Sequence, residues 1–184
     1  MMRPRIVHCS MFLLLMLAGC AGTRPDGEVA RQAMALQASV PAAIDCSMVA
    51  GKPFEMMALP VGPVADSRAP VGPVLNVRLH ALGVVSPLVR PGRKEKPDAR
   101  FAGLVPFRVE EGGTYTVLVA SLAWADLVEA NPTRLAESRG FKWVEACGKR
   151  FKSGLYALEP GRDYVVQLWD SPDRDLTLMV RRLR

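Results

Sequence analysis

Short apolar segments separated by turn residues fill the chain after Cys46, and this pattern restricts the fold more than any other feature. Apolar alternation over 105–109, a glutamate- and glycine-rich turn over 110–113 and a β-branched and aromatic run over 114–122 predict a hairpin. Both faces of 114–122 are largely apolar, which predicts a central strand covered on both sides. Turn signals recur about every 8–12 residues without a long helical pattern, so we expect an all-β domain over 46–184, an antiparallel β-sandwich or jelly roll.

The remaining strands are predicted from the same alternation of apolar and polar residues. A proline-rich stretch, in which Pro-Val-Gly-Pro-Val occurs at 60–64 and again at 70–74, predicts an edge or an extended surface loop, because proline cannot donate to a central strand. Further strands are expected within 46–59 and over 75–81, 124–129, 141–147, 151–158, 164–168 and 176–180.

The start of the chain has the organisation of an export signal. Arg3 and Arg5 precede a mostly apolar run, residues 6–16, which is too short for a stable membrane span. The quartet Leu17-Ala18-Gly19-Cys20 then resembles the lipobox of bacterial lipoproteins. An ordinary secretory signal with a chance cysteine is the alternative.

The lipobox resemblance implies that residues 1–19 are a cleaved signal peptide and that Cys20 carries acyl chains such as palmitate. More than one chain anchors a protein durably to a membrane. Ala21 follows in place of the aspartate associated with inner-membrane retention, which favours the outer membrane, facing the periplasm. The alanine-rich stretch 20–45, with a short helix expected over 28–38, then serves as a tether.

The cysteines left after processing are Cys46 and Cys147, because Cys9 leaves with the signal and Cys20 carries lipid. In an oxidising compartment such a pair most simply forms one disulfide. Metal binding is the alternative, but two distant cysteines and the single remaining histidine, His80, make a poor site. We therefore expect neither a metal nor another cofactor.

The charge of the chain indicates few partners. Removal of the signal takes away two arginines and no acidic residue, which lowers the net charge from +6 to +4. The basic run 90–96 is typical of a solvated loop, with contact to anionic lipid headgroups as the alternative. An exported protein does not routinely meet nucleic acid, so we expect no nucleic-acid partner.

Two family resemblances cover the C-terminal part. Phe107–Val180 resembles the bacterial pre-peptidase C-terminal-like β-sandwich, through the sequences at 107–109, 112–117, 158–161 and 164–168. This resemblance implies the fold and says little about function. The same region is similar to small exported proteobacterial proteins of uncharacterised role, through Trp124, Asp126, Gly140, Cys147 and Pro160-Gly161.

Most catalytic classes lack their residues in this chain. Arg139 stands where the second group often has a histidine, and a non-haem iron triad needs two histidines. No Gly-x-Ser-x-Gly elbow accompanies His80, which is predicted to lie on the polar face of its strand as an ordinary surface residue. Paired-carboxylate chemistry has four candidate residues, Asp126, Glu129, Glu137 and Glu145.

The tryptophans are the remaining candidates for a binding surface. Trp124, Trp143 and Trp169 are of the type that usually fills a core, but an exposed one is suited to stack on a sugar or anchor a partner. We therefore expect a lipid-anchored, non-catalytic binding or accessory module of the cell envelope, with an envelope protein or a glycan as partner. The alternative is a carbohydrate-binding or weakly hydrolytic envelope enzyme.

Overall fold

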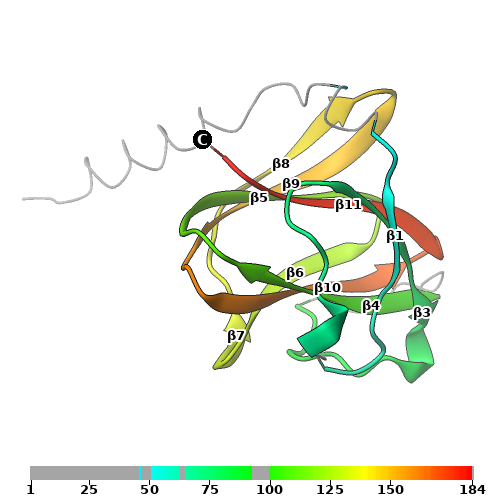
Figure 1. The fold of residues 1–184 in the computed structure, drawn as a ribbon. Helices are drawn as coiled ribbons and strands as arrows, with labels where there is room; N and C mark the ends of the chain where they lie inside the picture. The colour runs from blue at the N-terminus through cyan, green and yellow to red at the C-terminus, as the bar shows by residue number, and fades with distance from the viewer. Residues whose placement is uncertain (1–45, 47–50, 63–64, 93–99, 184) are drawn as a thin grey trace, which may run out of the picture.

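Two β-sheets pack face to face in the computed structural model, which describes residues 46, 51–62, 65–92 and 100–183 (Figure 1). This confirms the all-β sandwich. The predicted signal peptide, Cys20 and the tether lie outside the described residues. The strands are β1 Phe54–Met57, β2 Val74–Arg78, β3 His80–Ala81, β4 Phe101–Val109, β5 Gly113–Ala120, β6 Trp124–Ala130, β7 Thr133–Leu135, β8 Ser138–Ala146, β9 Lys149–Leu158, β10 Arg162–Ser171 and β11 Asp175–Arg182.

The larger sheet has the strand order β1-β2-β11-β5-β9-β8, and the smaller has the order β3-β4-β10-β6-β7. All of these strand pairs are antiparallel except β1 with β2. β5 lies between β11 and β9, as its two apolar faces predict. The short 3-10 turns Ala65–Ser67 and Leu82–Val84 complete the described elements.

The hairpin predicted over 105–122 is wrong. β4 pairs with β3 and β10 in the smaller sheet, whereas β5 belongs to the larger sheet, so the turn between them crosses from one sheet to the other. The β9–β10 turn crosses beside it, and a Cβ on Gly112 would lie 2.8 Å from Cδ of Pro160. Gly112 therefore allows the β4–β5 and β9–β10 turns, which both cross between the sheets, to pack closely against each other, and it does not mark a hairpin.

The main core fills the space between the sheets. Phe107 of β4 and Tyr164 of β10 are fully buried and stack with ring centroids 5.8 Å apart. The chain crosses from the larger sheet to the smaller at Ala58 and Leu59. The backbone N–H of Ala58 donates to the carbonyl oxygen of Arg78 in the larger sheet, and Leu59 forms a β-bridge with Leu104 in the smaller. Gly103 of β4 packs against Ala58 at this crossing. A Cβ on Gly103 would approach Cβ of Ala58 to 2.4 Å, so the crossing requires glycine at this position.

The outer face of the smaller sheet is also covered. Gln167 of β10 is fully buried, its Oε1 accepts a hydrogen bond from the backbone N–H of Leu88 at 2.8 Å, and its Nε2 donates to the carbonyl oxygen of Val89 at 2.9 Å. These bonds hold the segment around 88–89 against the sheet. Trp169 packs on the same face with Val85 and Ala102.

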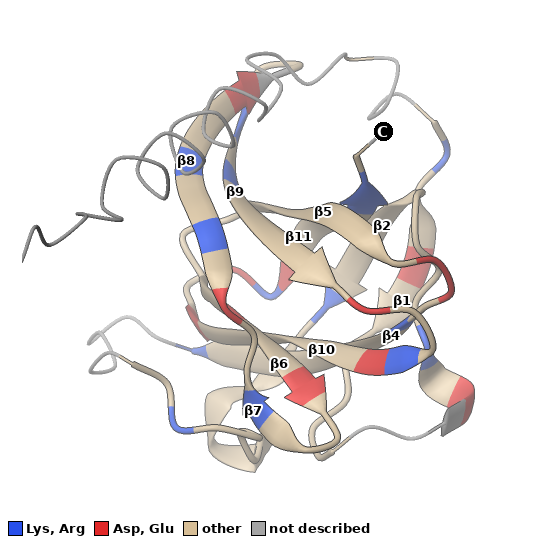
Figure 2. Ribbon diagram, turned by 90° about the vertical axis from the view of Figure 1, so that its left-hand side faces the viewer, with Lys and Arg blue, Asp and Glu red and all other residues tan. Residues whose placement is uncertain are grey.

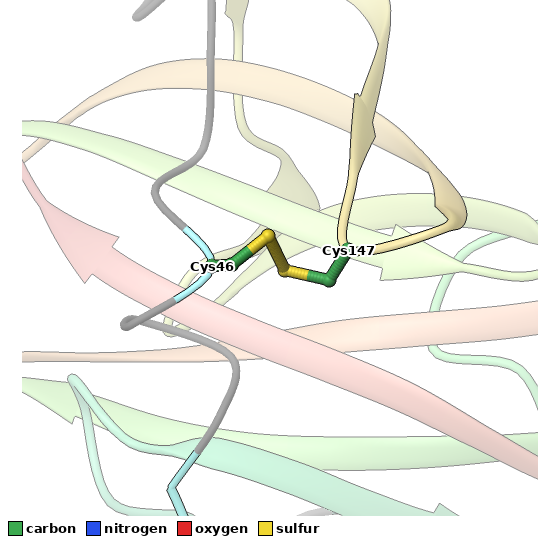
Figure 3. The surroundings of a disulfide bond; sticks show 2 residues. All are labelled: Cys46 and Cys147. Atoms are coloured by element: carbon green, nitrogen blue, oxygen red, sulfur yellow. A yellow bond between two sulfur atoms is a disulfide. The ribbon is translucent and has the colours of Figure 1, made fainter.

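A disulfide joins Cys46 to Cys147, with the two Cα atoms 5.3 Å apart (Figure 3). The predicted pairing is confirmed. Cys147 lies in the tight turn between β8 and β9, where it and Gly148 both have positive φ. The bond therefore attaches the chain ahead of β1 to the tip of the β8–β9 hairpin.

Candidate functional site

A cavity of about 480 Å³ opens between the two sheets. It lies on the side of the sandwich where β8 and β9 of the larger sheet face β6 and β7 of the smaller, and Figure 2 shows how these strands are arranged. Its first wall comes from β5, β8 and β9, with Val117, Phe141, Trp143 and Tyr156. Its second wall comes from β6, β10 and the segment after β7, with the residues Trp124, Asp126, Leu127, Ala136 and Val166.

The cavity exists because the smaller sheet ends early on this side. β7 has three residues and pairs only with 128–130 of β6, so 124–126 form a free sheet edge. Residues of β8 and β9 in the opposite sheet line the cavity together with residues of this edge. Gly154 of β9 leaves room for the ring of Tyr156, because a Cβ there would lie 2.8 Å from Cε2 of that ring. The ring of Tyr156 can therefore lie over Gly154 in the wall of the cavity.

Exposed apolar side chains surround the mouth. Phe141 is 61% exposed and Leu135 is 54% exposed, values that are high for large apolar residues on a folded domain. Trp143 is 38% exposed and contacts Phe141 edge to face, with ring centroids 6.1 Å apart. The guanidinium of Arg150 lies 4.6 Å from the Trp143 ring centroid and Nζ of Lys152 lies 5.4 Å from it.

Asp126 is the carboxylate of the cavity wall. Its Oδ2 is buried and has no hydrogen-bond partner in the described part of the chain. Burial raises the pKa of Asp126, and a hydrogen-bonding contribution from the Trp124 side chain partly opposes this shift. None of the ion pairs seen among the described residues includes Asp126, although Lys152 lines the same cavity.

Tyr156 supplies a second polar group. Burial raises its pKa to about 12, the negative charge of Asp126 adds to this shift, and a hydrogen bond with Ser138 opposes it. The phenol is therefore neutral throughout the physiological range and serves as a hydrogen-bonding group. Lys152, which also lines the cavity, donates to the carbonyl oxygen of Ala123 in the β5–β6 turn.

The three tryptophans proposed from the sequence lie in different surroundings. Trp143 and Trp124 line the cavity, Trp143 at the mouth and Trp124 half-buried at the free edge of β6. Trp169 is 6% exposed and does not line the cavity. Two of the three candidates are thus brought to one place.

The candidate carboxylates are not brought together. Glu129 pairs with Arg134 at 3.0 Å and with Arg162 at 3.4 Å, and Asp126 is the one acidic residue among the described residues that line the cavity. The described residues contain no cluster of three or more histidine, cysteine or acidic side chains able to hold a metal ion. The described residues that line the cavity include no histidine or cysteine and one carboxylate, so they form neither a nucleophile–histidine pair nor a carboxylate pair.

His80 has a structural environment rather than the free surface position predicted from the sequence. It is half-buried, and its Nε2 lies 2.8 Å from the carbonyl oxygen of Ala58, outside the cavity. The imidazole thus links β3 to the segment that crosses between the sheets.

Sequence reasoning missed Phe141, Tyr156 and Ser138 as members of one site. The available signal was the spacing Phe141-x-Trp143 on one strand and Gly154-x-Tyr156 on the next, which places four residues on one face of paired strands.

No helix in the described part of the chain is long and apolar enough to cross a membrane. Neither a family model nor a curated protein matches this chain.

Proposed function

We propose that this protein is an exported, lipid-anchored envelope protein whose sandwich binds a small, mainly apolar molecule without transforming it. The observation that carries the proposal is the cavity between the sheets, with apolar and aromatic walls and an exposed aromatic mouth. Pockets of this size and lining are typical of small-molecule sites. Exposed large aromatic side chains at a pocket mouth are typical of residues that anchor a ligand.

A binding role fits the residues of the cavity better than the hydrolytic alternative does. Hydrolysis of a glycoside by the usual route needs two carboxyl groups flanking the scissile bond, and the lining holds one, Asp126. A sugar presents many hydroxyl groups, whereas most lining residues, including Val117, Leu127 and Val166, offer no side-chain hydrogen bond. The cavity therefore suits an apolar body with few polar groups.

Binding is tested with the neutral fluorophore phenylnaphthylamine, whose emission rises in apolar surroundings. We expect saturable binding to the folded domain, and we expect Ala136→Phe to weaken it by about tenfold or more, because the added ring occupies the cavity. The matched control is Ala157→Phe, at an exposed position of β9 that does not line the cavity, and it should bind as the wild type does. Equal binding by the two variants, or no binding by the wild type, would contradict the proposed site.

The anchor is tested on the protein isolated from its own membranes. Mass spectrometry of the mature N-terminus is expected to find Cys20 with a thioether-linked diacylglyceryl group and an amide-linked acyl chain. Cys20→Ser should remove both the lipid and the membrane association, because serine lacks the thiol that forms the thioether and the protein then has no acyl chains to hold it in the membrane. An unmodified Cys20, or cleavage at another position, would refute the anchor and leave the cavity proposal standing.

A further inference from the structure

The carboxyl group of Asp126 is an unusual component of an apolar cavity. The residue as a whole is half-buried, but one of its oxygens is buried without a hydrogen bond, and none of the ion pairs seen among the described residues includes it. A buried charge without a partner is costly, so such a group is usually paired or neutralised. The Trp124 side chain, which contributes a hydrogen-bonding interaction to this carboxyl group, is neutral.

From this arrangement we infer that the ligand is an organic amine, with a protonated ammonium group held by Asp126 and an apolar body held by the aromatic walls. This inference rests on the proposed binding role of the cavity. The ammonium supplies both the positive charge and the N–H donors that the carboxylate lacks. Because the negative charge is shared by both carboxylate oxygens, an ammonium group next to either oxygen stabilises the whole group.

The surrounding aromatic rings strengthen the preference for a cation. Trp124 and Tyr156 line the cavity together with Asp126, and the faces of aromatic rings attract ammonium groups. At the mouth, the side chains of Arg150 and Lys152 already lie over the Trp143 ring, so this ring is less available to the ammonium group of a ligand. This charge distribution orients the ligand, with the ammonium at Asp126 and the apolar body toward Phe141 and Trp143.

The inference is tested with a matched series of ligands in which only the head group changes. Phenylbutylamine, phenylbutanol and phenylbutyrate are titrated calorimetrically into the folded domain at mildly alkaline pH, which favours the ionised form of Asp126 because burial raises the pKa of this group. We expect the amine to bind about tenfold or more tightly than the alcohol, as a charge-assisted hydrogen bond provides, and the carboxylate to bind most weakly.

Two conservative variants separate the role of Asp126 from a general effect of charge. Asp126→Asn keeps the size of the side chain and should reduce the affinity for the amine to that for the alcohol, within about twofold. Asp173→Asn makes the same change at an exposed position outside the cavity and should keep the full preference. Thermal melting of both variants shows that each is folded.

The possible results separate this inference from the proposed function. Equal binding of the amine and the alcohol, or a preference that survives Asp126→Asn, overturns the amine and leaves an apolar pocket. Binding of phenylnaphthylamine without binding of the amine has the same meaning. If no compound binds, both proposals fail.

A displacement experiment then distinguishes the sources of the amine. With phenylbutylamine bound, displacement by phosphatidylethanolamine vesicles but not by phosphatidylglycerol vesicles identifies a membrane aminolipid as the source. No displacement by either kind of vesicle identifies a soluble amine.

Discussion

Replacing Cys46 and Cys147 together by serine is expected to lower the free energy of unfolding by about 2–4 kcal/mol. The two cysteines are separated by 101 residues, and the chain-entropy value for so long a loop is about 4–5 kcal/mol. The measured loss should be smaller, because Cys46 lies ahead of β1 and is exposed, so holding this residue in place also costs entropy in the native state. Urea unfolding of the oxidised protein and of the double variant measures the difference.

Reduction of the wild-type protein provides the matched control for this prediction. The reduced wild type should unfold at the same urea concentration as the double-serine variant, and the variant should not respond to reductant. Identical midpoints for the oxidised wild type and the variant would mean that the bond contributes nothing to stability. Labelling of both thiols without reductant would mean that the bond does not form in solution.

The sequence was sufficient for the strands but not for all of their partners. Strand positions follow from local apolar alternation, and β5, β6 and β10 lie where the pattern predicts them. Pairing depends on which sheet each strand joins, which is a non-local property. The turn over 110–113 has glycine residues suited to a hairpin, yet the chain crosses between the sheets there, because β4 and β5 each pair with other strands.

Some requirements of the fold have no local signal at all. Gly103 lies inside a strand, and its need to be glycine comes from Ala58, which is distant in sequence and passes directly over it. The cavity is of the same kind, because it arises where a three-residue β7 leaves the edge of β6 uncovered. Composition identified Trp124 and Trp143 as candidates, but only the relative length of two sheets places them beside Asp126 and Tyr156.

Truncation of Phe107 to alanine is expected to destabilise the domain by about 3–5 kcal/mol, because it removes a fully buried ring and its stacking contact with Tyr164. A loss of this size is a large fraction of the stability of an ordinary domain. Urea unfolding measures the change. Ligand binding by the molecules that remain folded should be unchanged, since Phe107 does not line the cavity.

Phe141→Ala is the matched control, since it is the same substitution at the mouth of the cavity. Phe141 is 61% exposed, so its removal should change the free energy of unfolding by less than about 0.5 kcal/mol, as is usual for surface positions. The same change should weaken phenylnaphthylamine binding, because the ring forms part of the apolar wall.

If Phe141→Ala destabilised the domain as much as Phe107→Ala does, Phe141 would belong to the core and not to a binding site. If it left binding unchanged, the ligand would not use the aromatic mouth. Only the opposite responses of these two phenylalanines, one in stability and one in affinity, agree with a rigid sandwich that carries a separate site at its open side.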